Sequence, residues 1–358
     1  MTSIFKGLVF TLGISVATIG SVSAGNPDRA GEAGAYELLI NPFARSSGLY
    51  GLNTSSIRGV EALAVNPAGL AHLRKTEITF SRTQWLQGSG IGINTVGIAQ
   101  KFGKDKSNVI GFNLNNIQFG EIDRTTTTNP EGGLGTFKPS YLNFGLGYAR
   151  AFSNSIFAGV NVKFINERIE DLGASGFAID AGIQYITGPR NNIHFGLALR
   201  NVGVPMRFTG DGLTFRGNAI EGDYQMSQNQ KTEKFDLPSQ LNIGAGYDWW
   251  LDAKTRKENP YFRLSFSLAF IANSFGKDQF GAGMEFGYRE MFQARVGYRY
   301  EKGLTSAVDR TSAHTGLSAG MTVEVPFKKE GPALAIDYSY RSSSPFTGTH
   351  SIGLRFNL

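Results

Sequence analysis

The chain has 358 residues, a formal charge of +6, 46 glycines, 27 phenylalanines, 13 tyrosines and no cysteine. The lack of cysteine excludes a disulfide framework and thiolate metal sites, and the modest charge, without a dense Lys/Arg cluster, gives no sign of nucleic-acid binding. High glycine and aromatic contents together are typical of a membrane β-barrel, in which small residues give clearance inside and aromatic residues form belts at the two interfaces.

The first 24 residues have the pattern of a secretory signal peptide. Lys6 supplies the positive region, Gly7–Ile19 is apolar, and Val22 and Ala24 place small residues at the −3 and −1 positions. We expect cleavage after Ala24 and a mature chain that has left the cytoplasm. The small and polar residues from Gly25 to about Glu37 indicate a periplasmic lead-in.

Residues 38–73 lack the periodicity of a strand. Asn41-Pro42 and Asn66-Pro67 interrupt them, and proline neither donates to a β-ladder nor leaves the preceding residue free to be helical. Several apolar side chains here need cover: Ala62, Leu63, Val65 and Leu70. We interpret residues 25–75 as a lead-in and a hatch that folds inside a barrel made by residues 76–358. The alternative is an ordinary surface turn between a short helix and the first strand.

Almost everything after residue 75 alternates apolar and polar residues, as in 261–270, where Phe262, Leu264 and Phe266 share one face. Segments of 9–11 residues with this period fit tilted membrane strands. The predicted strands are 76–84, 91–101, 108–117, 140–150, 155–166, 174–186, 193–201, 237–248, 261–271, 279–288, 292–300, 313–325, 333–340 and 350–358. The predicted fold is therefore all-β, an antiparallel transmembrane barrel of about fourteen strands with an N-terminal plug in the lumen. A change of apolar face near Asn94-Thr95 predicts a bulge.

The connections between these strands alternate in length. The long ones, 118–139, 202–236, 301–312 and 341–349, all follow odd-numbered strands, whereas most of the others are brief and rich in turn formers. Outer-membrane barrels have long outer loops and short periplasmic turns. The connection 249–260 is an exception, since it is long for an inner turn.

Charged residues on the inward face are the first candidate site. By alternation they are Lys163, Asp180, Arg200, Glu285, Arg295, Arg299 and Asp337. Buried charges need partners, so we expect these residues to pair across the lumen or with the hatch. An open, water-filled pore would tolerate the same residues.

Three segments carry a resemblance to a known family: Glu37–Gly48, Asn66–Ala71 and Thr79–Trp85. They resemble the FadL-type outer-membrane transporters and, more closely, the PorV/PorQ family of Bacteroidota-type bacteria. The resemblance implies a plug built from Asn41, Pro42, Ala44, Arg45, Gly48, Asn66, Pro67, Ala68, Gly69 and Leu70. Two departures, Val65 in place of the usual aromatic residue and the FadL-like Gly69-Leu70-Ala71, leave open whether the chain is the secretion shuttle or a paralogue.

The resemblance also implies a function and a place. Members of that family belong to the type IX secretion system, which exports cargo that bears a C-terminal signal domain. We therefore expect a Gram-negative outer-membrane barrel, in contact with membrane lipid, that binds a secretion channel or a secreted cargo protein through its outer loops. The alternative is a FadL-like transporter of a hydrophobic small molecule. The loop 202–236 offers apolar candidates for partner binding: Val204, Met206, Phe208, Leu213 and Phe215.

Catalysis and cofactor binding find little support in the sequence. The chain has four histidines, of which His194 is expected to face inward, but no nucleophile motif accompanies it. Asp309 and His314 do not make a metal-ligand pattern. We therefore expect no catalytic residues, no metal and no cofactor.

Overall fold

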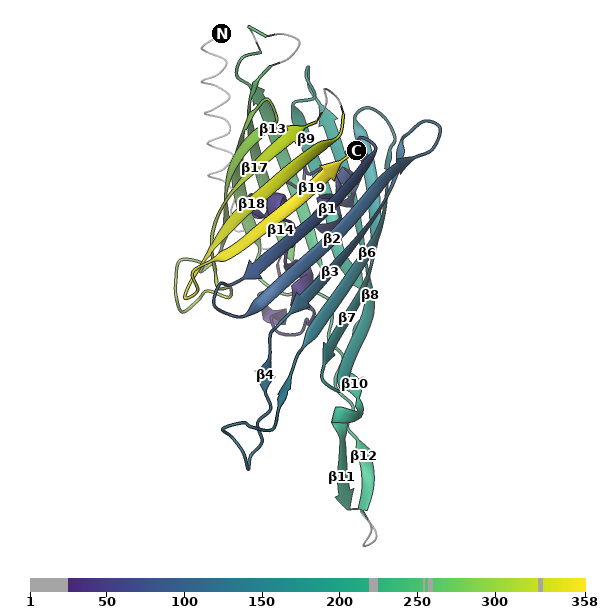
Figure 1. Ribbon diagram of the computed structural model, residues 1–358, viewed down its shortest axis with the longest axis vertical. Coiled ribbons are helices and arrows are strands. Elements are labelled where there is room, and N and C mark those ends of the chain that lie inside the picture. The colour runs from purple at the N-terminus through teal and green to yellow at the C-terminus, as the bar shows by residue number, and fades with distance from the viewer. Residues whose placement is uncertain (1–24, 219–224, 254, 257–259, 328–330) are drawn as a thin grey trace.

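The computed structural model describes residues 25–218, 225–253, 255–256, 260–327 and 331–358. The expected signal peptide lies outside these residues. The architecture is a closed antiparallel barrel of fourteen strands (Figure 1). The strands of the wall are β1 (Thr76–Trp85), β2 (Ile91–Phe102), β3 (Asn108–Gln118), β6 (Ser140–Ala151), β7 (Ile156–Ile169), β8 (Leu172–Thr187), β9 (Ile193–Gly203), β13 (Gln240–Trp250), β14 (Phe262–Asn273), β15 (Gln279–Tyr288), β16 (Phe292–Glu301), β17 (His314–Pro326), β18 (Ala333–Ser343) and β19 (Thr349–Asn357).

Each wall strand pairs with the next one along the chain, and the last strand returns to the first. β1 and β19 are antiparallel, with Glu77 opposite Asn357 and Gln84 opposite His350. Closure leaves no unpaired sheet edge in the wall, as a bilayer requires. The predicted barrel fold is thus confirmed.

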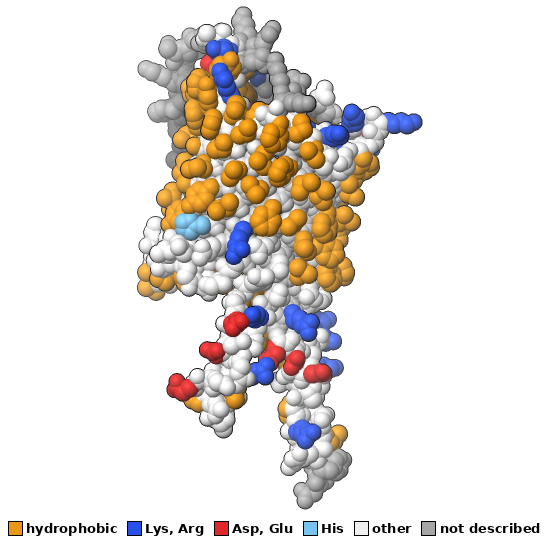
Figure 2. All heavy atoms as spheres, in the orientation of Figure 1, with side chains coloured by type: hydrophobic (Ala, Val, Ile, Leu, Met, Phe, Trp, Pro, Cys, Tyr) orange, Lys and Arg blue, Asp and Glu red, His pale blue; other side chains and the backbone are white. Residues whose placement is uncertain are grey.

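The two faces of the wall differ in the way that the alternation predicts. Large apolar side chains such as Phe177 and Leu268, each 58% exposed, point outward, and Figure 2 shows them as a broad band over the wall, with charges gathered below the band on the projecting loops. Glycine, polar and charged residues point inward. Such a band is stable in lipid, and it would be unfavourable in water.

The two ends of the barrel are unlike each other. Thr76 and Leu358 lie at one end, which we call the turn end, and Trp85 lies at the other, the hairpin end. Two hairpins project from the hairpin end (Figure 1): β4 (Ile122–Asp123) with β5 (Thr136–Phe137), and β11 (Thr214–Asn218) with β12 (Gln225–Asn229). The short β10 (Thr209–Gly210) and η5 (Asp211–Leu213) precede β11. The alternation of loop lengths is therefore real.

The predicted bulge near Asn94-Thr95 is wrong. β2 keeps an uninterrupted register with both β1 and β3. The apolar face changes because Ile93 points inward, where it is 1% exposed. The register shifts instead between Ile179 and Ala181 of β8, and between His314 and Ser318 of β17.

The segment before β1 runs through the lumen and has no strand in the wall. It contains η1 (Pro27–Arg29), η2 (Tyr36–Leu39), α2 (Ala44–Ser47), η3 (Val60–Ala64) and η4 (Pro67–His72). We call residues 33–73 the hatch. No helix in the part of the chain that the structure describes is long and apolar enough to cross a membrane.

The lead-in enters the barrel at the hairpin end, and not at the turn end as expected from the sequence. The Asn26 amide lies 3.4 Å from the Asn273 carbonyl, and Arg29 forms a 2.9 Å ion pair with Asp236; both partners lie at the hairpin end. The physical reason is that the hatch spans the lumen lengthwise. It must begin at the far end, since it leaves at the turn end to start β1.

Candidate functional site

The hatch touches every strand of the wall. Its helices α2, η3 and η4 contact β1, β2, β3, β6, β7, β8, β17, β18 and β19. Residues 49–55 contact the rest, since they lie against Gly196 of β9, Gly244 of β13, Gly281 of β15 and Gly297 of β16, and Leu52 clusters with Ala269 of β14. The hatch is therefore packed against the full circumference of the barrel.

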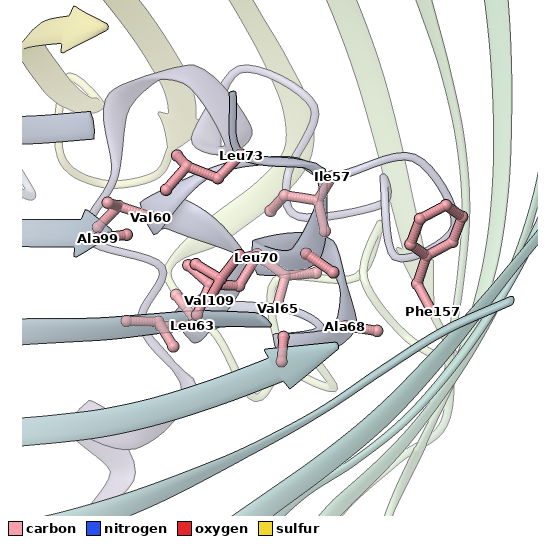
Figure 3. Close-up of a cluster of buried hydrophobic side chains, with 14 of the residues drawn as sticks. Ile57, Val60, Leu63, Val65, Ala68, Leu70, Leu73, Ala99, Val109 and Phe157 are labelled. Atoms are coloured by element: carbon pink, nitrogen blue, oxygen red, sulfur yellow. The ribbon is translucent and has the colours of Figure 1, made fainter. Parts of the chain in front are cut away.

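Leucines of the hatch fit against glycines of the wall. A Cβ atom on Gly147 would lie 2.2 Å from Leu63 Cδ2, and one on Gly281 would lie 2.2 Å from Leu52 Cδ2. Leu63 and Leu70 are fully buried in the largest apolar cluster, together with Val60, Val109 and Phe157 (Figure 3). The wall glycines thus provide the space that the hatch needs for close packing.

Asn66 and Pro67 anchor the centre of the hatch. The Asn66 side chain is completely buried, donates from Nδ2 to the carbonyls of Thr54 (2.9 Å) and Ile183 (3.2 Å), and accepts from the Ala68 amide (3.1 Å). It is the N-cap of η4, and Pro67 takes the first helical position, where its missing N–H costs nothing. Ala68, Gly69 and Leu70 continue this buried turn.

Asn41 and Pro42 anchor the other half of the hatch. Asn41 donates to Ser46 Oγ (2.8 Å) and accepts from the Phe43 amide (3.2 Å), while the Pro42 carbonyl accepts a hydrogen bond from Ser81 of β1 (2.9 Å). Of the remaining motif residues, Ala44 lies against Gly353, and Gly48 against Gly320. Arg45 lies 3.8 Å from Glu61, which also accepts from the Ser46 amide.

Inward charges form a ladder across seven consecutive strands. Arg263 of β14 joins Asp248 of β13 (3.8 Å) to Glu285 of β15 (2.8 Å), and Glu285 pairs with Arg295 of β16 (2.9 Å). Arg295 donates to Thr322 of β17 (2.7 Å), Thr322 donates to Asp337 of β18, and Asp337 lies 3.6 Å from Arg355 of β19. Arg295 also donates to the Arg45 carbonyl (3.2 Å), which ties the ladder to the hatch.

A second group of charges lies on the opposite arc of the wall. Lys163 forms a 2.6 Å ion pair with Asp180 and donates to Asn201 (2.8 Å). Arg200 donates to Gln240 and to the Leu38 carbonyl, both at 3.2 Å. Six of the seven inward charges named from the sequence thus have polar partners. The expected pairing is wrong for Arg299, whose guanidinium stacks on the Tyr50 ring, 4.0 Å from its centroid.

Two cavities lie on different sides of the hatch and share no lining residue. A cavity of about 480 Å³ at the turn end is lined largely by charged side chains, among them Arg58, Glu61, Glu77 and Arg263. A cavity of about 40 Å³ lies between Pro42 and the wall asparagines Asn113 and Asn143. The larger cavity is polar and the smaller one has room for little more than water, so neither offers an apolar route through the lumen.

The apolar loop candidates are divided by the structure. Met206 is 1% exposed and packs against Leu38 and Ile165, and Phe208 stacks on Phe235, with centroids 5.9 Å apart. Met206 covers the hatch and is not free to bind a partner, which corrects the expectation for this residue, whereas Phe208 is partly exposed. Val204 (60% exposed), Phe215 (50%) and the partly exposed Leu213 remain accessible.

The histidines lie in structural contacts. His194 donates from Nε2 to Asp248 (3.0 Å), whose other oxygen accepts from Ser265, so the ring and the hydroxyl bind the carboxylate and not each other. His72 donates to Gln184 (2.9 Å), and burial, with the nearby charge of Arg58, lowers the pKa of His72 to about 3. Across the described residues, no group of three or more His, Cys, Asp or Glu side chains could hold a metal ion.

Sequence reasoning missed several residues that hold the hatch. Glu77 accepts from the Val60 amide (2.7 Å), and Gln184 donates to the carbonyls of Thr54 and Ile57. Asp248, Arg263 and Arg355 belong to the ladder but were not included among the predicted inward charges. All five lie on the inward face by strict alternation, so the signal was present for each of them, although their partners could not be read from it.

The fold and the lumen define the class of protein: an outer-membrane β-barrel with an N-terminal hatch. The profile of the family described as "Type IX secretion system membrane protein PorP/SprF" matches residues 61–340. The chain belongs to this family of type IX secretion proteins. The match agrees with the type IX secretion part of the sequence resemblance, but the family that matches is PorP/SprF. No curated protein matches the chain.

Solved structures share the fold at low sequence identity. The toluene transporter TodX of Pseudomonas putida has 11% identity and a TM-score of 0.54, over 88% of this chain and 97% of TodX. The monoaromatic hydrocarbon channel CymD has 11% identity and a TM-score of 0.52, over 89% of this chain and 97% of CymD. At this identity the likeness shows the barrel architecture and nothing about the ligand.

Proposed function

We propose that this barrel is a non-enzymatic partner in protein secretion, which binds a translocon or cargo protein through the hairpins at its hairpin end. The observation that carries the proposal is the contact of the hatch with every wall strand. A lumen filled in this way leaves binding at an end as the way for the barrel to act. Membership of a type IX secretion family supports the same role.

The hairpin end is the end that we assign to the cell exterior. Long outer loops and short periplasmic turns are the rule for outer-membrane barrels. The hairpins β4–β5 and β11–β12 reach beyond the wall, where a second protein can contact them (Figure 1). On β11–β12, Phe215 and Met226 are 50% and 46% exposed, which provides apolar contact area among polar neighbours.

A test removes the hairpin without opening the lumen. Residues 211–231 are replaced by a short Gly-Ser turn, so that Met206, Phe208 and Phe235 still cover the hatch. The matched control shortens the other hairpin, at residues 124–135. We expect the first variant to fold and to lose a protein that co-purifies with the wild type from outer membranes. Unchanged co-purification in both variants would reject the hairpins as the binding surface.

The PorV/PorQ resemblance adds a finer hypothesis, in which the barrel travels with its cargo as a shuttle. A shuttle is recovered in two separate complexes, one with the channel and one with the cargo. A fixed component of the translocon is recovered in one. Size separation of the co-purified material distinguishes these two roles.

The alternative function is transport of a hydrophobic small molecule, and one observation favours it. A groove of about 600 Å³ on the outer wall is lined by apolar side chains, including Val160, Ile183, Leu197 and Leu199. The wall separates this groove from the polar lumen. Uptake of a hydrophobic solute that is lost when Asn66 and Pro67 are both changed to Ala, with no protein co-purifying, would favour transport over secretion.

A further inference from the structure

Among the residues that the structure describes, two arginines at the hairpin end of the lumen lack an acidic partner. Arg341 of β18 is 3% exposed, and its Nε and Nη2 have no hydrogen-bond acceptor. Arg299 of β16 is partly exposed to the lumen. In the described part of the chain, neither guanidinium lies within ion-pair distance of a carboxylate. Their contacts are with rings: Arg299 over Tyr50 at 4.0 Å, and Arg341 over Trp85 at 5.0 Å.

The same place holds other polar atoms without partners. Tyr50 is 6% exposed and its hydroxyl makes no hydrogen bond, and His314 is 5% exposed with Nε2 unpartnered. The His314 ring packs edge-on against Tyr50 (5.9 Å) and Trp85 (4.8 Å). Tyr50, His314 and Trp85 thus form one cluster of rings, and both guanidiniums contact this cluster.

A buried cation without a counter-charge is unfavourable, because it has lost its hydration and gained no partner. The arginines of the ladder avoid this cost. Arg263, Arg295 and Arg355 each lie within 4 Å of at least one carboxylate oxygen. The cation–π contacts of Arg299 and Arg341 recover part of the loss, but Nε and Nη2 of Arg341 still have no acceptor among the described residues.

We propose that Arg299, Arg341 and Tyr50 form a binding site for an oxyanion, either a carboxylate or a phosphate group. A guanidinium presents a planar fork of donors that matches both groups, and a phenol hydroxyl supplies one further donor. The site lies at the hairpin end, above the hatch, and Arg299 keeps it open to the lumen. This inference does not depend on the proposed function, since a free ion and an anionic group of a bound partner present the same chemistry.

Trp85 provides a local reporter for the site. The chain has three tryptophans, so the double change Trp249→Phe, Trp250→Phe leaves Trp85 alone. The purified barrel in detergent is titrated with sodium acetate, which tests a carboxylate, and separately with inorganic phosphate, at fixed pH and ionic strength. We expect a saturable change in Trp85 fluorescence with at least one of the two anions. The anion with the lower midpoint concentration shows whether the site prefers a carboxylate or a phosphate.

The variants Arg341→Gln and Arg299→Gln should each raise the anion concentration at the midpoint about ten-fold or more, since each removes a charge-assisted hydrogen bond. The matched control is Arg82→Gln, because Arg82 lies on the outer face of β1, and its midpoint should stay unchanged. If Arg341→Gln does not fold, the partly exposed Arg299 carries the test. The site is rejected if neither anion gives a saturable change in the folded barrel, or if the midpoint is the same in the arginine variants and the control.

Discussion

Arg295 and Arg299 lie four residues apart on the inner face of β16, yet their surroundings are opposite. Arg295 pairs with Glu285, donates to Thr322 and to the Arg45 carbonyl, and is enclosed between the wall and the hatch. Arg299 has a ring for its partner and no carboxylate within the described parts of the chain. The ladder around Arg295 pairs its own charges, whereas the ring cluster around Arg299 and Arg341 leaves donors without an acceptor among the described residues. Alternation makes the two residues equivalent, and only the neighbouring strands and the hatch make them different.

The largest expected effect on stability is that of a change in the charge ladder. Arg295→Ala leaves Glu285 buried with Arg263 as its remaining partner, and it removes a link between wall and hatch. Breaking a buried ion pair costs about 3–5 kcal/mol. Urea unfolding in detergent, followed by the gel mobility of unboiled samples, measures the loss, with Arg82→Ala on the outer face as the matched control. A loss no larger than that of the control would show that the ladder does not hold the barrel together.

Asn66→Ala should have the next largest effect. It leaves the carbonyls of Thr54 and Ile183 and the amide of Ala68 without their side-chain partner. Unsatisfied buried groups and a lost N-cap together cost about 2–3 kcal/mol. The same unfolding assay applies, with Asn166→Ala, on the outer face of β7, as the control. Equal stability of the two variants would mean that Asn66 is not an anchor.

The next prediction concerns the pH dependence of stability that arises from His72, a residue of the hatch. Because the folded pKa of His72 is about 3 and the ordinary value is 6.5, protons bind the unfolded chain more readily. This contribution to stability is fully present above pH 6.5 and is lost as the pH falls from 6.5 toward 3. For the partly exposed His72 we expect a loss of about 1–2 kcal/mol at pH 5.

Glu37 acts in the opposite direction, since burial raises the pKa of its carboxyl. The variant His72→Gln therefore isolates the histidine. Gln keeps a donor for Gln184 and has no proton to bind. The stability difference between the wild type and this variant should shrink between pH 7 and pH 5, and a constant difference would contradict the assignment.

The smallest effect is expected for Arg299→Ala. The change removes a cation–π contact worth about 0.5–1 kcal/mol, and no buried acid is left behind. Stability should therefore change by about 1 kcal/mol or less in the assay used for Arg295→Ala. A loss of stability as large as that of Arg295→Ala would mean that Arg299 has a charged partner, and the contrast between the two arginines would be wrong.

The sequence predicts the strands of the wall far better than it predicts the contacts inside the lumen. Period-two alternation is a local property that follows from the strand itself, so all fourteen wall strands could be located. Ile93 misled the same reasoning, because an inward apolar residue opposite the hatch resembles a bulge. The pairing of Glu285 with Arg295 and the isolation of Arg299 depend on strands and hatch residues that meet only in three dimensions.

The same limit explains the errors at the ends. The lead-in enters where Arg29 meets Asp236, 207 residues further along the chain, because the hatch spans the lumen lengthwise, and no local pattern predicts that course. Met206 and Phe208 belong to an apolar stretch of loop that could face a partner or the hatch, and composition does not distinguish the two. The burial of Met206 became clear only with the position of Leu38 in the structure.

The central claim is that the hatch seals the lumen, and single-channel conductance in planar bilayers tests it most directly. The purified wild-type barrel is compared with the double variant Asn66→Ala, Pro67→Ala, whose wall is held by interstrand hydrogen bonds. We predict that the wild type is silent and that the variant, still folded by gel mobility, gives discrete conductance steps. Steady conductance steps in the wild type, unchanged in the variant, would show an open pore and contradict the account.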